Sequence, residues 1–130
     1  MIRRISKIIL HCSDSDASSH DNIETVTKWH VVENGWSDIG YHYFIDKSGE
    51  LFKGREIPVV GAHCRGHNYD SIGICLSGRN EFTESQFIRA KDLVSTLAKQ
   101  YNIKKSMILP HNRLDPGKTC PNFDILNVLE

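Results

Sequence analysis

The segment from Thr83 to Tyr101 is the feature that most limits how this chain can fold. Its first residues, Thr83-Glu84-Ser85-Gln86, fit a capping box, with Thr83 as the N-cap and Gln86 as the third helical residue. Apolar residues then recur at steps of three and four, at Phe87, Ala90, Leu93, Val94, Leu97, Ala98 and Tyr101. A helix with this spacing has one apolar face, and that face has to be buried against another layer of structure.

Short apolar segments provide the second layer. Five of them have the composition and length of β-strands: Ile5–Cys12, Tyr41–Asp46, Leu51–Lys53, Ser71–Leu76 and Met107–Leu109. The run Ser71–Leu76 is almost wholly apolar, as expected of a central strand that is buried on both faces. The turn Lys47-Ser48-Gly49 joins the second and third segments, which predicts a hairpin.

The remaining segments complete the expected fold. Apolar residues at helical spacing predict a helix from Asn22 to Asn34, stopped by Gly35, and the tail from Asp124 predicts one or two helical turns. Residues 58–70 are rich in glycine, proline and histidine and predict a long loop, a kind of segment that is usually functional or disordered. We therefore expect an α/β fold, with one domain over residues 1–130 and a central mixed β-sheet flanked by helices.

Composition excludes several classes of function. Lys and Arg together number 16 and Asp and Glu also number 16, so the chain lacks the basic excess of most nucleic-acid-binding proteins. No apolar stretch approaches the roughly 20 residues that a transmembrane helix needs. The apolar run Ile8–Leu10 is too short for a signal peptide, so we expect synthesis in the cytoplasm, with the four cysteines reduced.

Three of the residues that can bind metal lie far apart in the chain. His11 ends the first predicted strand, His111 follows the last one 100 residues later, and Cys120 comes nine residues after His111. A structural zinc finger would use tight pairs such as Cys-x-x-Cys, whereas ligands gathered from distant segments are typical of a catalytic zinc site with water in the fourth position. However, the chain has seven histidines, and most histidines are not ligands, so composition alone leaves the question open.

Five ordered segments resemble the type 2 amidase and peptidoglycan-recognition superfamily, and especially the small amidase endolysins of bacteriophages. The segments are IILHCS (8–13), WHVVENGWSDIGYHYFI (29–45), GELFKGRE (49–56), VGAHCRGHNYDSIGICLSG (60–78) and PHNRLDPGKTCPNFD (110–124). The resemblance implies the fold of this superfamily. It also implies zinc-dependent hydrolysis of the amide bond between the lactyl group of N-acetylmuramic acid and L-alanine in peptidoglycan.

The resemblance also implies roles for individual residues. It implies zinc ligands at His11, His111 and Cys120. It also implies a catalytic tyrosine at Tyr41 and a catalytic lysine at Lys118. His63 matches a histidine that lines the substrate groove of the family. The step from His111 to Cys120 varies among relatives, so the register of Lys118 is less secure than that of the ligands. The expected chemistry has zinc activating water or polarising the scissile carbonyl, while Tyr41 and Lys118 stabilise the oxyanion.

Other interpretations of the same residues stay open. Tyr43 shares the strand parity of Tyr41 and could face the site in its place, but the family pattern chooses Tyr41, and we expect Tyr43 to be a packing residue. His42 should face the opposite way from Tyr41 and be structural. Lys118 is by default a solvated loop residue. His63 is either a substrate contact or a loop anchor, and Asn68 and Ser71 are expected to pin its loop by local hydrogen bonds.

We expect four further residues to be structural. His30 should be hydrogen-bonded, Trp29 and Trp36 should lie in the core, and Cys12 should point away from the ligands and be buried. No role can be assigned to Cys64 from the sequence.

Three functions compete with a wall-lysing amidase. They are a muropeptide-recycling amidase of the cytosol, a peptidoglycan-binding module without activity, and a structural zinc protein. The presence of both Cys120 and Tyr41 favours catalysis, because the recognition proteins that do not cut lack the cysteine ligand. We expect a monomer that is made in the cytoplasm and acts on the cell wall after release. We expect it to bind no nucleic acid and not to insert into a membrane.

Overall fold

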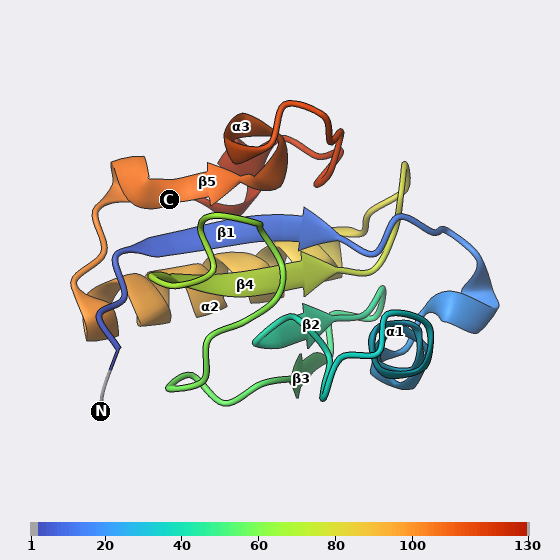
Figure 1. Cartoon of the computed structure of the whole chain (residues 1–130). Coiled ribbons are helices and arrows are strands. Elements are labelled where there is room, and N and C mark those ends of the chain that lie inside the picture. Colours follow the sequence, from blue (N-terminus) through green and yellow to red (C-terminus); the bar gives the residue numbers. More distant parts are fainter. Residues whose placement is uncertain (1–2, 130) are drawn as a thin grey trace.

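The computed structural model describes residues 3–129, so residues 1–2 and 130 of the expected 1–130 domain lie outside the described part. A five-stranded sheet runs through the molecule in the order β3-β2-β4-β1-β5 (Figure 1). Its strands are β1 (Lys7–Cys12), β2 (Tyr43–Ile45), β3 (Leu51–Lys53), β4 (Ser71–Leu76) and β5 (Ile108–Pro110). Only the β2–β3 hairpin is antiparallel, which confirms the expected mixed sheet.

The parallel strands bring their carboxyl ends to one edge of the sheet (Figure 1). β1 lies between β4 and β5, although β5 is the last strand in the sequence. The register places His11 opposite Cys75 and Leu10 opposite Pro110. The end of β1 is therefore next to the segment that follows β5.

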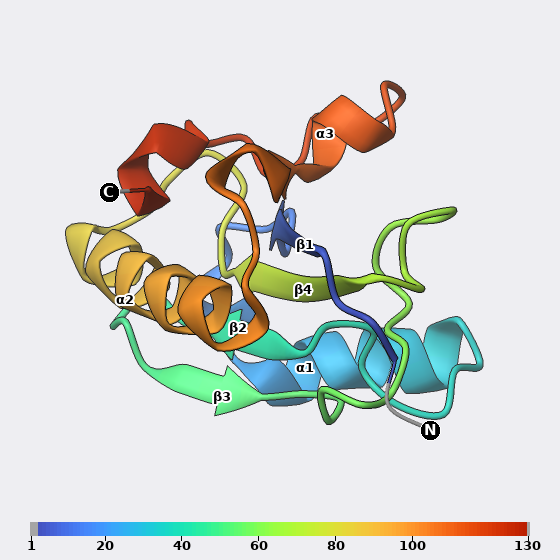
Figure 2. The same ribbon diagram turned by 90° about the vertical axis from the view of Figure 1, so that its left-hand side faces the viewer.

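The helix α2 (Glu84–Tyr101) covers one face of the sheet, as Figure 2 shows. Its expected capping box is present, because the Thr83 side chain accepts a hydrogen bond from the Gln86 N–H and the Gln86 side chain accepts one from the Thr83 N–H. The apolar face of α2 packs on the strands in a cluster that includes Ile8, Leu10, Ile74, Ala90, Val94 and Leu97. Since these residues are almost inaccessible to solvent, this cluster is the main core.

A second, smaller cluster lies on the opposite face. Val26 of helix α1 (Ile23–Lys28) packs against Phe44 and Cys75, together with Ile39. The helix expected over residues 22–34 is present but changes its type. Its first part is α1, and its second part is a π-helical turn, η2 (Trp29–Glu33). Gly35 ends this segment with a φ of 72°, a left-handed conformation that suits glycine.

The sequence did not predict most of the short helical elements. They are η1 (Ser18–His20), η3 (Lys105–Met107), α3 (His111–Leu114) and η4 (Ile125–Val128), of which only η4 matches the expected turn near the end. Each spans four residues or fewer, too short for a periodic pattern. Across residues 3–129, no helix combines the length and the apolar character needed to cross a membrane.

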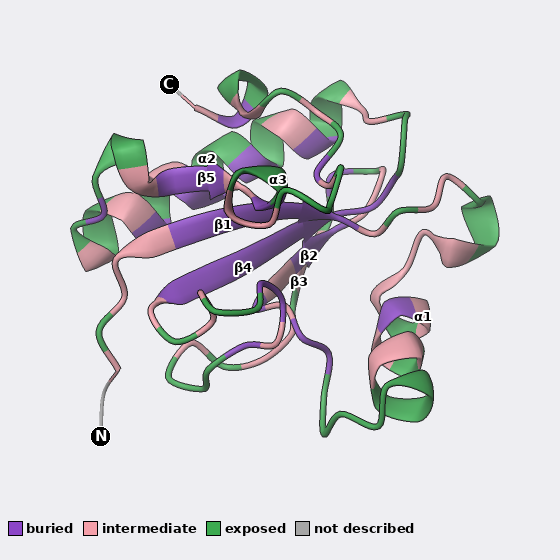
Figure 3. Cartoon of the chain, turned by 45° about the horizontal axis from the view of Figure 1, so that its top comes forward, coloured by how far each residue is buried: buried purple, intermediate pink, exposed green. Residues whose placement is uncertain are grey.

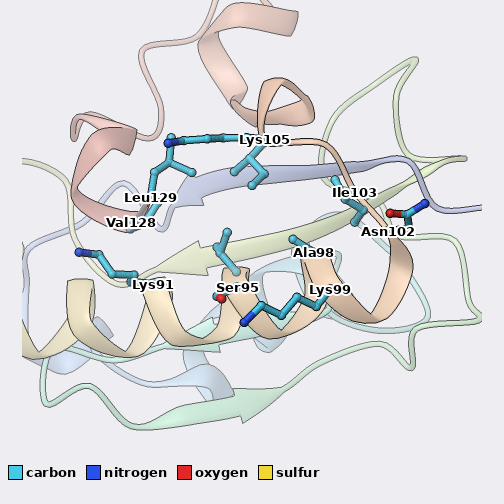
Figure 4. Close-up of a pocket in the computed structure, with 11 residues that line it drawn as sticks. Lys91, Ser95, Ala98, Lys99, Asn102, Ile103, Lys105, Val128 and Leu129 are labelled. Carbon is cyan, nitrogen blue, oxygen red and sulfur yellow. The ribbon is translucent and has the colours of Figure 1, made fainter.

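Burial follows the layers of the fold, with buried residues concentrated in β1 and β4 (Figure 3). A cavity of about 500 Å³ opens on the α2 side, between the end of α2, η3 and η4, with Lys91, Lys99 and Lys105 among the residues that line it (Figure 4). Val94 and Ile108 line it as well and belong to the main core, so this cavity lies across the sheet from His11.

Candidate metal centre and active site

Two histidines meet at the carboxyl end of β1 and β5. His11 is the penultimate residue of β1 and His111 is the first residue of α3, directly after β5. The two Nδ1 atoms are 3.1 Å apart, and both side chains are buried. The pairing of β1 with β5 therefore brings together two residues that are 100 positions apart in the sequence.

Cys120 completes the group. The segment after α3 returns to the end of β1, where the backbone N–H of Asn112 donates to the carbonyl of Cys120 at 2.8 Å. The backbone N–H of Cys12 donates to the Cys120 Sγ at 2.9 Å. The candidate ligand atoms of His11, His111 and Cys120 all lie within 4.8 Å of one another, close enough to hold one metal ion.

The surroundings keep the two imidazoles neutral. Burial lowers the pKa of His11 well below its ordinary value, and the neighbouring histidines act in the same direction. Burial also lowers the pKa of His111, against an opposing effect of Asp115, while the charge of Lys118 lowers it further. A neutral imidazole has the lone pair that a metal requires.

The third donor has a different environment. Contact with the Cys12 thiol, together with burial, raises the pKa of Cys120, and the same contact lowers the pKa of Cys12. With a cation bound, Cys120 would be a thiolate, and the Cys12 N–H would stabilise the negative charge on its sulfur. Two neutral imidazoles and one thiolate form a donor set that fits zinc.

Tyr41 lies beside this group. The centroid of its ring is 5.1 Å from that of His11, and the ring packs against the cluster of Phe44 and Cys75. Burial raises the pKa of Tyr41 well above its ordinary value. The phenol is therefore a hydrogen-bond donor rather than a base at neutral pH.

Tyr43 is a packing residue, as expected, but the strand parity that we expected to relate Tyr41, His42 and Tyr43 is wrong. Tyr43 packs with the main core on the α2 side, whereas Tyr41 packs with Phe44 on the opposite side. Regular pairing of β2 begins only at Tyr43, so alternation does not extend back to Tyr41. His42 instead packs near His63, with 5.8 Å between ring centroids, and it is structural as expected, because its Nδ1 accepts the Gly73 N–H at 3.1 Å.

Lys118 lies in the exposed turn between α3 and Cys120. Its backbone N–H donates to the Asp115 carbonyl at 3.0 Å, and its charge reaches His111. The structure thus places Lys118 near the ligand group, with its side chain in solvent.

His63 lies against the ligand group from the other side. Its Nδ1 is 2.8 Å from the His11 Nε2, and its side chain is only 9% exposed. Asn68 pins the loop as expected, because its Oδ1 accepts from the backbone N–H groups of His63 and Cys64, each at 2.8 Å. Ser71 pins it too, by donating to the His67 carbonyl at 2.7 Å.

The other structural expectations have mixed outcomes. All four cysteines lie in the described part and are free thiols. Cys12 is buried as expected, but the expectation that it points away from the ligands is wrong, because its thiol contacts Cys120. The Nδ1 of His30 accepts the Gly40 N–H at 2.8 Å, which confirms a hydrogen-bonded histidine. Trp29 packs against the second cluster, but Trp36 is 36% exposed and covers His30 instead of entering the core.

Comparisons with known proteins agree with this geometry. Residues 2–123 match the family model described as N-acetylmuramoyl-L-alanine amidase. The endolysin of Escherichia phage T7 is 34% identical over 91% of this chain and 81% of its own length. Peptidoglycan-recognition protein SC2 of Drosophila melanogaster is 32% identical over 90% of this chain and 65% of its own.

Solved structures share the fold. The N-acetylmuramoyl-L-alanine amidase LysC from Clostridium intestinale aligns with a TM-score of 0.84 at 27% identity, over 97% of this chain and 83% of that one. A variant of Drosophila PGRP-LB in complex with tracheal cytotoxin aligns with a TM-score of 0.79 at 26% identity, over 92% of this chain and 76% of that one. With its mixed sheet, its His/His/Cys group and these relatives, the chain belongs to the N-acetylmuramoyl-L-alanine amidase family, in the same superfamily as phage endolysins and peptidoglycan-recognition proteins.

Proposed function

We propose that this enzyme is a zinc-dependent N-acetylmuramoyl-L-alanine amidase that acts as a cell-lysing endolysin. Its substrate is peptidoglycan, and the bond that it cuts joins the lactyl group of N-acetylmuramic acid to L-alanine. The observation that carries the proposal is the convergence of His11, His111 and Cys120 beside Tyr41. The printed names of the phage relatives support the lytic role, and the complex of PGRP-LB with tracheal cytotoxin supports a muropeptide-like substrate.

Zinc, when bound, would supply a Lewis acid for the scissile carbonyl and a nucleophilic water at neutral pH. His11 and His111 would hold it through their Nδ1 atoms, which face each other. The Cys120 thiolate would cancel one of its two charges, and the Cys12 N–H would keep that sulfur oriented.

Two further side chains would act on the reacting carbonyl. Tyr41 has its proton held in place by burial and would donate a hydrogen bond to the oxygen that becomes negative. Lys118 would bring positive charge to the same oxygen from the exposed turn. Substrate contact by His63 remains a prediction of the sequence resemblance.

The proposal also includes the oligomeric state of the enzyme and the place where it acts. The whole chain, residues 1–130, would work as one amidase domain and as a monomer. The enzyme would be made in the cytoplasm and would reach the wall after release. Sedimentation of the purified protein would test the monomer directly.

The test is to incubate the purified protein with isolated sacculi, with zinc or with a chelator, and to identify the products by mass spectrometry. We expect free peptides that begin at L-alanine, lost with chelator and in Cys120→Ser. Cys64→Ser is the matched control, because Cys64 is also a free thiol but lies outside the ligand group. Protein that stays bound to uncut sacculi would overturn catalysis, and cleavage of free muropeptides alone would overturn the endolysin role.

A further inference from the structure

A line of hydrogen bonds leads away from the second nitrogen of His11. The His11 Nε2 lies 2.8 Å from the His63 Nδ1, and the His63 Nε2 lies 3.2 Å from the Ser71 Oγ. The Ser71 Oγ in turn donates to the His67 carbonyl oxygen at 2.7 Å. All three side chains are buried, so the line runs through the interior to a backbone group.

The carbonyl at the end of the line fixes the direction of every bond in it. A carbonyl oxygen only accepts, so the single proton of the Ser71 hydroxyl is committed to His67. The Ser71 oxygen must therefore accept from the His63 Nε2–H. A neutral His63 that is protonated on Nε2 has a bare Nδ1, which must accept from the His11 Nε2–H.

The last step reaches the metal centre. A neutral His11 that is protonated on Nε2 has a bare Nδ1, and this is the atom that faces the Nδ1 of His111. We propose that His63 and Ser71 are positioning residues, which lock His11 in the one tautomer whose lone pair points into the metal centre. Partners of this kind orient metal-binding histidines and raise their basicity. The inference rests on the proposed function only where it names the ion.

The loop around His63 is built to hold its ring still. A Cβ on Gly73 would come within 2.6 Å of the His63 ring, and one on Gly61 would come equally close. The absence of both side chains lets the ring lie against β4. Lys7 and Asp70 clamp the end of the loop to β1, with an ion pair of 3.1 Å.

The packing also limits what else His63 can do. Both of its ring nitrogens have partners inside the protein, and only 9% of the residue is exposed. A substrate group would have to displace His11 or Ser71 to bond with it. A positioning role therefore explains the burial and the two hydrogen bonds of His63 without any contact between His63 and substrate.

The direct test is the protonation of the imidazole nitrogens, read by nitrogen-15 NMR of the metal-free protein. We expect His11 and His63 each to carry the proton on Nε2 before any metal is added. Ser71→Ala should release this preference in His63. His67→Ala is the matched control, because it removes that side chain but keeps the carbonyl, and it should leave both tautomers unchanged. An Nδ1 proton on His11 in the wild type would overturn the proposal.

Zinc affinity, measured by competition with a chromophoric chelator, gives the second readout. We expect His63→Leu to weaken zinc binding by about 10- to 100-fold, the usual cost of losing such a partner. His63→Asn should recover part of this loss, because its Oδ1 can accept from the His11 Nε2–H. Thermal unfolding of the metal-free variants separates this effect from a folding defect.

The outcomes distinguish the two proposals. Unchanged zinc affinity in both His63 variants, with a raised KM for peptidoglycan, would overturn positioning in favour of substrate contact and leave the amidase intact. A wild-type protein that binds no zinc, but has the expected tautomers, would overturn the proposed metal and leave the hydrogen-bond relay standing.

Discussion

Tyr41 and Tyr43 are two residues apart, yet they lie on opposite faces of the sheet. Tyr41 packs beside the candidate metal ligands, and Tyr43 packs into the main core under α2. The two phenols therefore form a natural pair of test and control. In the proposed mechanism the Tyr41 hydroxyl is the one that would donate to a developing oxyanion, because its ring lies beside His11.

Tyr41→Phe is expected to lower kcat by about 100- to 1,000-fold, as loss of one oxyanion donor usually does. Zinc affinity should be unchanged, because Tyr41 is not in the ligand group. Tyr43→Phe should retain wild-type turnover. Kinetics on sacculi would check this, and equal losses in both variants would contradict it.

A single carboxylate, that of Asp16, joins three loops. It accepts hydrogen bonds from the backbone N–H groups of Arg79 and Asn80 at 2.8 and 3.0 Å, and from Lys47 Nζ at 3.0 Å. These bonds, led by the one from Arg79, hold the pKa of Asp16 well below its ordinary value. A carboxyl with a lower pKa in the folded state stabilises the fold above its unfolded pKa, and this stabilisation is lost as the pH falls.

Asp16→Asn should therefore lower the melting temperature most near neutral pH. The unfolded pKa of an aspartate is about 3.9, so the gap to the wild type should begin to shrink below about pH 4. Thermal unfolding over a pH series would measure this gap. A gap that is constant with pH would show that charge on Asp16 does not contribute.

At the scale of elements, the start of α2 joins two strands. The buried Gln86 Nε2 donates to the carbonyls of Ile45 and Ser77 at 3.3 and 2.8 Å, and its Oε1 accepts the Thr83 N–H at 2.9 Å. One side chain thus caps the helix and satisfies the ends of β2 and β4. Its burial makes each of these bonds costly to leave unmade.

Gln86→Met keeps the shape of the side chain but removes all three bonds. We expect it to lower the free energy of unfolding by about 2–4 kcal/mol, since each buried group left without a partner costs about 1–3 kcal/mol. Thr83→Ala, which loses the half-buried part of the same cap, should cost about 1 kcal/mol. Urea unfolding of both variants would check the order, and an equal cost would contradict the role of burial.

The elements differ in how well their sequence predicts them. Helix α2 and strands β3 and β4 were predicted within one residue of their ends, because their local pattern and their packing agree. Helix α3 was missed, since four residues carry no periodicity. The start of β2 was predicted at Tyr41, but the strand begins at Tyr43. That start depends on where pairing with β4 begins rather than on residue type.

The candidate site was predictable in its parts but not in its connections. The resemblance named His11, His111 and Cys120, and the structure brings them together. Neither the N–H contact from Cys12 nor the relay through Ser71 could be read from the sequence. Both depend on how loops pack along β1, and a loop's hydrogen bonds follow from tertiary contacts.

At the scale of the whole molecule, the main core and the candidate site lie on opposite faces of the sheet. The main core lies between the sheet and α2, and the ligand group lies with the second cluster at the other face. A substitution in one cluster is therefore expected to leave the other largely unaffected.

Leu97→Ala removes a buried side chain of α2 and should lower the free energy of unfolding by about 2–5 kcal/mol. Zinc affinity and turnover well below the melting temperature should stay unchanged. Phe44→Ala, beside Tyr41, should reduce both stability and turnover. Calorimetry and kinetics on the two variants would compare them, and reduced turnover in Leu97→Ala would contradict the separation.

The pairing of β1 with β5 has a consequence for biosynthesis. His11 is made early and Cys120 late, and β1 has no second neighbour until residues 108–110 have been added. On the proposed function, a nascent chain therefore carries one of the three zinc ligands for most of its synthesis and lacks the complete centre. A chain released before Cys120 is added would lack the third proposed ligand, so we expect such a product to be inert.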